Sequence, residues 1–185
     1  MTAAPGLALP KGLVFETDRW DGTLATAVMD DTRTYRYLLT RIWDTSSQPM
    51  VWVMLNPSTA DAMQDDPSIR RCIGFARREH CGGIAVVNLF ALRSTDPRAL
   101  RGHPDPIGPH NEAFLRQTTT LGPVVAGWGA GGVLGDRAAT VTRTLTASGV
   151  RMRALGVTST GQPRHPLYLS GKAALTPYTG TGAAA

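Results

Sequence analysis

The chain has 185 residues, of which 42% are hydrophobic and 18% are charged, and this composition excludes an intrinsically disordered protein. The length suits one domain with a sizeable hydrophobic core. The formal net charge of +5 indicates that a polyanionic partner, DNA or a nucleotide, should be considered. Arginine supplies nearly all of this charge, since the only lysines are Lys11 and Lys172. Arginine favours bidentate contacts with phosphate, although a GC-rich genome produces the same excess.

Cysteine usage and hydropathy exclude several other classes of protein. Cys72 and Cys81 are too few for a metal site of their own and do not resemble a disulfide framework, so we expect reduced packing residues. No apolar run approaches the ~18 residues needed to span a membrane, and the N-terminus lacks a basic-then-apolar signal sequence. We therefore expect a cytoplasmic monomer without metal, cofactor or membrane partner.

The first third of the chain reads as β structure. Residues 1–12 are rich in small residues, and we expect them to be loose. Residues 32–44, "TRTYRYLLTRIWD", alternate roughly between apolar and polar, and "TSSQ" then precedes "PMVWVML". This pattern predicts an N-terminal antiparallel hairpin, within about residues 12–50, that leads into a buried strand.

Strands then alternate with helices. Asp66 is placed to cap a helix that begins at Pro67, and Asp136 is placed to cap another. The first helix has an apolar stripe made of Ile69, Cys72, Ile73 and Ala76. The apolar strands are expected over residues 51–55, 82–88, 123–129 and 151–157.

This alternation predicts an α/β fold: a three-layer α/β/α sandwich with a central four-stranded parallel sheet and the N-terminal antiparallel hairpin. We expect a single domain over residues 1–178 and a loose tail over residues 179–185.

Polar side chains lie at or just beyond the ends of these strands. In open α/β sheets the ligand binds outside the carboxyl ends of the strands. Asn56 comes directly after the first strand, Asn88 ends the second, Trp128 lies at the end of the third, and His165 lies in the loop after the fourth. We therefore expect Asn56, Asn88 and His165 to meet at one rim.

Each of these residues also has a structural interpretation. Asn56 and Pro57 suit a turn in which Ser58 caps the next segment of the chain. Asn88 could be a buried amide that ties two loops together. A lone histidine such as His165 is often structural. Their shared position at strand ends favours a functional site.

Two resemblances sharpen this hypothesis. The motifs "LNPSTAD", "DPSIRRC" and "NLFALR" resemble an uncharacterised family known as domain of unknown function 1643, over roughly residues 35–170. The order of "LNPS", "VVNLFALRSTDP", "VVAGWG" and "TGQPRHPLYL" resembles, more distantly, the uracil-DNA glycosylase superfamily. The sequence departs from that superfamily where His-Pro-Leu-Tyr replaces His-Pro-Ser.

The distant resemblance implies catalytic roles. Asn56 matches the residue that positions the attacking water, Asn88 the amide that reads a pyrimidine edge, and His165 the donor to a carbonyl of the departing base. Breaking an N-glycosidic bond builds positive charge on the sugar and negative charge on the base, so such groups would lower the barrier. Asp61 is the candidate base, because an amide cannot accept the proton from water.

Further residues are expected to bind substrate. Asp66 is most simply a helix cap, but the start of its helix could bring N–H groups and Arg70 or Arg71 near a phosphate. Leu167 or Tyr168 could fill the gap left by a flipped base, or the leucines could pack onto the sheet. The expected substrate-binding residues are Ser58, Asp66, Arg71, Asn88, Phe90, Arg164, Leu167 and Tyr168.

The sequence thus predicts a uracil-DNA-glycosylase-like hydrolase that cleaves or recognises the N-glycosidic bond of a base, modified or not, in nucleic acid. Two alternatives remain open. One is a non-catalytic module that binds a modified base, and the other is an enzyme that acts on free nucleosides or nucleotides.

Overall fold

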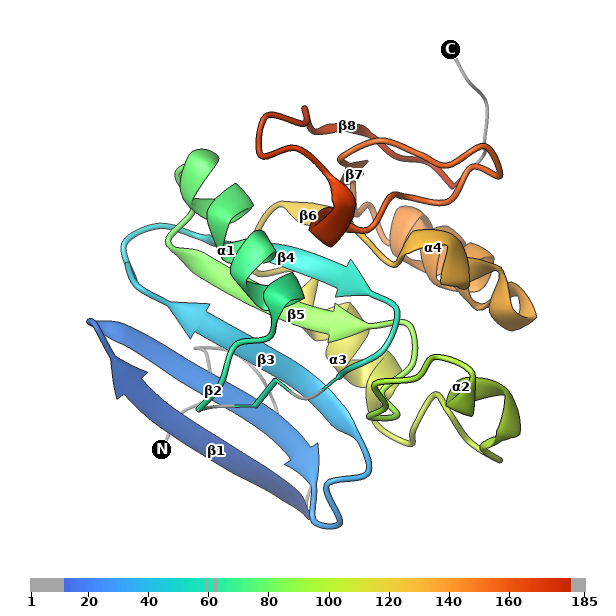
Figure 1. The fold of residues 1–185 in the computed structure, drawn as a ribbon, viewed down its shortest axis with the longest axis horizontal. Helices are drawn as coiled ribbons and strands as arrows, with labels where there is room; N and C mark the ends of the chain where they lie inside the picture. Colours follow the sequence, from blue (N-terminus) through green and yellow to red (C-terminus); the bar gives the residue numbers. More distant parts are fainter. Residues whose placement is uncertain (1–11, 59, 62, 181–185) are drawn as a thin grey trace.

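The computed structural model describes residues 12–58, 60–61 and 63–180. Most of the two segments expected to be loose, residues 1–12 and 179–185, therefore lies outside the described residues. The described chain forms one eight-stranded sheet with the strand order β1-β2-β3-β5-β4-β6-β7-β8 (Figure 1). The strands are β1 (Leu13–Trp20), β2 (Thr23–Asp30), β3 (Arg36–Ile42), β4 (Pro49–Met54), β5 (Gly83–Asn88), β6 (Val124–Ala126), β7 (Met152–Ala154) and β8 (Thr176–Pro177).

Helices cover both faces of this sheet. The α-helices are α1 (Pro67–Arg78), α2 (Ala99–Gly102), α3 (Asn111–Thr118) and α4 (Arg137–Ala147), and the 3₁₀ helices are η1 (Gly129–Asp136) and η2 (Pro166–Tyr168). Helix α1 lies in front of β4 and β5 in Figure 1, and α3 lies behind the sheet. Trp52 of β4 belongs to the core on the α1 side, whereas Val51 and Val53 belong to the core shared with α3 and α4. Alternate residues of one strand thus face opposite helices, which is why the strand is apolar throughout.

The α/β class is confirmed, and the sheet is larger than the sequence suggested. Strands β5, β4, β6 and β7 pair in parallel, as the strand–helix alternation indicates. Strands β1, β2, β3 and β8 extend the same sheet through antiparallel pairs. The parallel strands are therefore part of a mixed sheet of eight strands and do not form a separate sheet of four.

The predicted hairpin across "TSSQ" is wrong, because β5 lies between β3 and β4. Strand β5 pairs antiparallel with β3 and parallel with β4. All six of its residues are buried, so both of its edges need a strand partner. The connection from β3 to β4 crosses the start of β5, where the Asp44 amide donates to the carbonyl oxygen of Gly82 at 2.9 Å and the Gly82 amide donates to that of Gln48 at 3.0 Å. The antiparallel hairpins of the N-terminal region are β1–β2 and β2–β3.

The first predicted helix cap is confirmed and the second is wrong. The Asp66 carboxylate accepts a hydrogen bond from the Ile69 amide at 2.8 Å and has the extended dihedral angles of a capping residue, φ −78° and ψ 169°. Asp136 has a left-handed φ of 54° and makes no side-chain capping hydrogen bond to a described residue. Of the predicted apolar stripe of α1, Ile69, Cys72 and Ala76 are buried, together with Phe75, whereas Ile73 is only half-buried.

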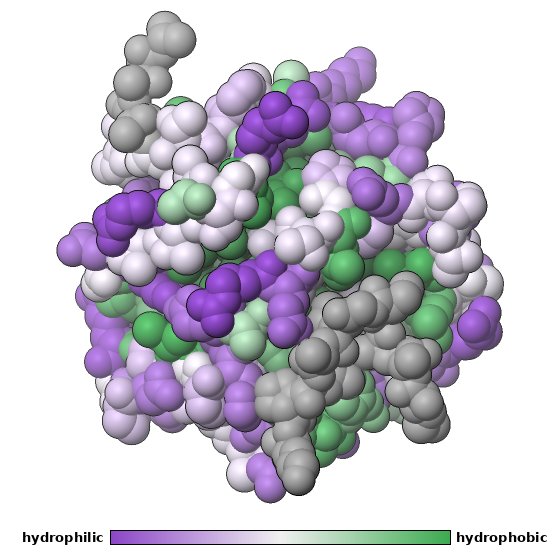
Figure 2. Space-filling view, turned by 180° about the vertical axis from the view of Figure 1, so that it is seen from behind, coloured by the Kyte–Doolittle hydropathy of each residue, from purple (hydrophilic) through white to green (hydrophobic). Residues whose placement is uncertain are grey.

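The C-terminal part of the described chain belongs to the sheet. Strand β8 pairs with β7, and the ring of Tyr178 packs edge-on against Trp128 with centroids 5.6 Å apart. From behind, hydrophilic residues are spread across the surface with hydrophobic ones visible between them (Figure 2). Among residues 12–58, 60–61 and 63–180, no helix is both long and apolar enough to cross a membrane.

Candidate functional site

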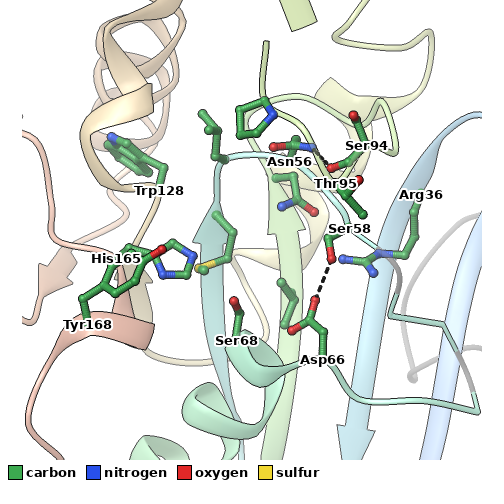
Figure 3. Close-up of a pocket in the computed structure, with 15 residues that line it drawn as sticks. Arg36, Asn56, Ser58, Asp66, Ser68, Ser94, Thr95, Trp128, His165 and Tyr168 are labelled. Atoms are coloured by element: carbon green, nitrogen blue, oxygen red, sulfur yellow. Dashed lines mark hydrogen bonds between the residues drawn. The ribbon is translucent and has the colours of Figure 1, made fainter. Parts of the chain in front are cut away.

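A cavity of about 230 Å³ lies at the carboxyl ends of β4 and β5. Seven residues that the sequence singled out line it, together with Arg36, Ser68 and Ser94 (Figure 3). These seven are Asn56, Ser58, Asp66, Asn88, Trp128, His165 and Tyr168. The meeting of three strand-end residues, Asn56, Asn88 and His165, agrees with the rule that ligands bind beyond the carboxyl ends of parallel strands.

Asn56 joins the two loops that form one wall of the cavity. Its Nδ2 donates to the carbonyl oxygens of Ser94, at 2.8 Å, and Pro57, at 3.0 Å. The Ser94 amide in turn donates to the carbonyl oxygen of Pro57 at 2.9 Å. Because both N–H bonds of the amide are used, Asn56 can offer only its Oδ1 to a ligand or a water molecule.

Asn88 presents an unsatisfied acceptor. Its side chain is 2% exposed, and its Oδ1 has no hydrogen-bond partner among the described residues. Leaving a buried acceptor unpaired costs about 1–3 kcal/mol. Other buried polar atoms of the described residues, Oδ1 of Asn111 among them, are unpartnered too, and what distinguishes Asn88 from Asn111 is that it lines the cavity. The backbone carbonyls of Asn88 and Leu89 are held separately by Nδ2 of Asn111, at 3.0 Å each. It is Asn111, rather than Asn88, that acts as the buried structural amide here.

His165 is a neutral hydrogen-bond donor. Its Nδ1 accepts a hydrogen bond from the Leu167 amide at 3.2 Å, which leaves the ring proton on Nε2. Burial lowers the pKa of His165 below its ordinary value, and the negative charge of Asp66 only partly opposes this. Gly129 lies close to His165, because a Cβ at this glycine would lie 3.3 Å from Cβ of His165.

This environment predicts a loss of stability in acid. The folded-state pKa of His165 is lowered, so its contribution is complete above the unfolded pKa of about 6.5 and is lost as the pH falls from there towards the folded pKa. Urea unfolding at about pH 7.5 and about pH 5 measures the difference. In the variant His165→Gln the decrease should be smaller. An unchanged decrease in the variant would show that His165 does not titrate as inferred.

Asp66, and not Asp61, is the carboxylate in the cavity. Oδ2 of Asp66 accepts a hydrogen bond from Oγ of Ser58 at 3.0 Å, while Oδ1 caps α1. Oδ1 of Asp61 accepts from the amides of Met63, at 2.8 Å, and Gln64, at 3.0 Å, and Asp61 does not line the cavity. The structure therefore does not bring Asp61, the expected base, into this cavity. Asp61 closes a turn, a common role for a short carboxylate side chain.

Four other predicted binding residues lie outside the cavity lining. Arg71 donates to the carbonyl oxygens of Leu169 and Pro166 and so fastens η2 to α1. Phe90 is buried in the core, and Arg164 is exposed. Leu167 is half-buried. By contrast, Tyr168 is 83% exposed at the edge of the cavity, and its ring centroid lies 5.6 Å from that of His165.

The structure also adds a residue that the sequence interpretation missed. Arg36, in β3, is 3% exposed and lines the cavity. Its guanidinium donates to the carbonyl oxygen of Ala60. Burial lowers the pKa of Arg36 to about 9, even though Asp66 and Asp61 raise it. An arginine at the first position of the strand "RYLLTRI", directly before Tyr37, Leu38 and Leu39, is the signal that could have identified it.

No metal site accompanies this cavity in the described part of the chain, where no group of three or more His, Cys, Asp or Glu side chains could hold an ion. Cys72 and Cys81 are free cysteines, and burial raises the pKa of the Cys72 thiol. Both observations agree with packing roles for the two cysteines.

Comparison with known proteins places the chain in a family. No curated protein and no solved structure matches it. A family model described as "Protein of unknown function (DUF1643)" matches residues 36–167, which is more than half of the chain. Every residue that lines the cavity except Tyr168 lies within the matched range. The chain therefore belongs to the DUF1643 family.

Proposed function

We propose that the cavity binds a nucleobase and that the protein hydrolyses the N-glycosidic bond of that base in nucleic acid. The observation that carries the proposal is that Asn88, whose buried Oδ1 has no hydrogen-bond partner among the described residues, lines the same cavity as His165. A ring N–H of the base would donate to Asn88, and Nε2–H of His165 would donate to a carbonyl oxygen of the base.

The size and position of the cavity support this proposal. At about 230 Å³ it is smaller than the roughly 300–1,000 Å³ of most drug-sized sites, which suits a single base. The expected three-layer α/β/α arrangement, with ligands bound at the strand ends, is supported by α1 on one face of the sheet and by α3 and α4 on the other.

The chemistry of bond cleavage assigns the remaining groups. As the bond breaks, positive charge develops on the sugar and negative charge on the base. His165 would stabilise the base, and Asp66 would favour the positive sugar and orient the attacking water together with Oδ1 of Asn56. Asp66 thus takes the role that the sequence interpretation gave to Asp61.

Non-catalytic base recognition is the second candidate, and one observation favours it. Both carboxylate oxygens of Asp66 already accept hydrogen bonds, from Ser58 and from Ile69. These two hydrogen bonds hold Ser58 and the start of α1 in place, which gives Asp66 a structural role that does not require catalysis.

The test uses oligonucleotides that each carry one candidate base, normal or modified, in single- and double-stranded form, with free nucleosides and nucleotides assayed in parallel. Cleavage is measured as abasic sites, and binding is measured by calorimetry. Abasic product that is lost in Asp66→Asn would support hydrolysis, and binding without product would support the second candidate. Absence of both binding and cleavage for every base would refute the proposal. Affinity for DNA should fall steeply with salt, whereas turnover of free nucleosides should not.

Tyr168 should contribute to binding of duplex DNA without contributing to stability. A base reaches such a cavity only after leaving the stack, and an exposed aromatic ring at the edge can occupy the gap. We expect Tyr168→Ala to weaken duplex binding by about 1–3 kcal/mol, the usual contribution of aromatic stacking, and to leave the melting temperature unchanged. As a control, Leu169→Ala should lower the melting temperature, because Leu169 packs against the core. A lower melting temperature in Tyr168→Ala would contradict this role.

A further inference from the structure

Arg36 is a buried cation with unused hydrogen-bonding capacity. Figure 3 shows its guanidinium directed from β3 towards Ser58 at the cavity wall. Arginine has five N–H donors, and the hydrogen bond to the carbonyl oxygen of Ala60 is the only one that the guanidinium makes to a described residue. Its Nε is buried without a partner among those residues. Burying a charge that is incompletely hydrogen-bonded is costly, and the arrangement therefore calls for an explanation.

Arg41, in the same strand, is paired much more fully than Arg36. Its Nε forms an ion pair with Oδ1 of Asp65 at 2.8 Å. Its two terminal nitrogens make three further hydrogen bonds, to the carbonyl oxygens of Thr40, Asp61 and Gln64. Arg41 does not line the cavity, whereas Arg36 does. The buried arginine without an ion pair is thus the one that faces the space for a ligand.

The charged groups around Arg36 do not neutralise it fully. Asp66 and Asp61 favour its charged form, whereas Arg93 and Arg41 oppose it. Asp66 is held by Ser58 and by the start of α1, and Asp61 is held in its turn. Neither carboxylate forms an ion pair with Arg36 within the described residues. Burial outweighs the attraction of the two carboxylates and lowers the pKa of Arg36 to about 9.

We propose that Arg36 is an anion-binding residue of the cavity and receives a negatively charged oxygen of the ligand. Such an oxygen has two possible sources. One is a nucleobase that carries negative charge on a ring carbonyl oxygen, and this source rests on the proposed function. The other is a phosphate group, and this source does not. In both cases the anion would form charge-assisted hydrogen bonds with a cation that is already desolvated, where they are strong.

The experiment compares three probes by calorimetry at about pH 8: uracil, which is mostly neutral there, 5-nitrouracil, which is an anion there, and inorganic phosphate. Each probe is titrated into the wild type and into Arg36→Gln, Arg36→Lys and Arg143→Gln. Arg143→Gln is the matched control, since it removes the same charge from an exposed position on α4. Circular dichroism and thermal unfolding establish that each variant is folded.

If the negatively charged oxygen belongs to a base, the wild type should bind 5-nitrouracil at least about tenfold more tightly than uracil. Arg36→Gln should lose this preference, and Arg36→Lys should retain part of it. If the negatively charged oxygen belongs to a phosphate group, Arg36→Gln should bind phosphate at least about tenfold more weakly than the wild type, whereas Arg143→Gln should not. Anion affinities that are the same in Arg36→Gln and Arg143→Gln would overturn the inference.

The outcomes also separate this inference from the proposed function. Binding of uracil without any preference for the anion would leave the proposed function standing and refute the role of Arg36. Binding of phosphate through Arg36 without binding of any base would do the reverse. If Arg36→Gln does not fold, nuclear magnetic resonance of the wild type supplies the answer. The Nε–H resonance of Arg36 is assigned as the one that is missing from the spectrum of Arg36→Lys. This resonance should shift when an anionic probe is added, and an unshifted resonance would refute the inference.

Discussion

Replacing Asn88 with leucine should abolish base binding while leaving the protein at least as stable as the wild type. The side chain is almost entirely buried, and its Oδ1 has no partner among the described residues. Removing an unsatisfied polar group in favour of an apolar one of similar size is neutral or stabilising. If the same oxygen accepts a ring N–H from the base, its loss should lower base binding or turnover by about 100-fold or more.

Urea unfolding and calorimetric titration of nucleobases measure the two effects of Asn88→Leu separately. Asn111 is the matched control, because it is also fully buried but donates to the carbonyl oxygens of Asn88 and Leu89. Asn111→Leu should lower the free energy of unfolding by about 1–3 kcal/mol, since it removes a buried donor from two carbonyl oxygens, of which only that of Leu89 has a second side-chain donor, Nε of Arg137 at 2.8 Å. A loss of stability in Asn88→Leu as large as in Asn111→Leu would indicate that Asn88 is structural. Such a result would remove the main support for a base-binding site.

The largest expected effect on stability comes from Gly82→Ala. A Cβ at this position would lie 2.1 Å from the carbonyl oxygen of Asp44 and 2.4 Å from that of Ser47. Both atoms are backbone, so no change of side-chain rotamer can relieve the contact. The connection between β3 and β4 would have to move off the start of β5, with loss of the hydrogen bonds that Gly82 makes there. We expect the free energy of unfolding to fall by about 3 kcal/mol or more.

Gly74→Ala provides the control for this substitution. Gly74 lies in α1, and an added Cβ would have no atom within 4 Å. Alanine should therefore stabilise the helix by about 0.5–1 kcal/mol. Denaturant unfolding of the two variants should thus give effects of opposite sign. A small effect of Gly82→Ala would show that the β3–β4 connection can move and does not need its close contact with β5.

Local patterns in the sequence determined a large part of this protein. Helix α1 was predictable from Asp66, Pro67 and the spacing of the apolar residues after them, because capping and helical periodicity depend on residues only a few positions apart. The buried strands and the polar residues at their ends were predictable for the same reason. Ligands bind beyond the carboxyl ends of parallel strands, and this rule predicted that Asn56, Asn88 and His165 would meet, as they do in the lining of one cavity.

Only the tertiary structure decided the features that depend on distant parts of the chain. Strand β5 lies between β3 and β4, because a strand buried on both faces needs a strand partner at both edges. No local pattern in the sequence indicates which strands those partners are. Asp61 closes a turn while Asp66 lines the cavity, and the backbone at Ala60 and Asp61 is held by the side chains of Arg36 and Arg41 of β3. Arg36 is buried and lines the cavity together with residues that follow β4 and β5. Such burial of a charged side chain arises only when segments far apart in the sequence pack together.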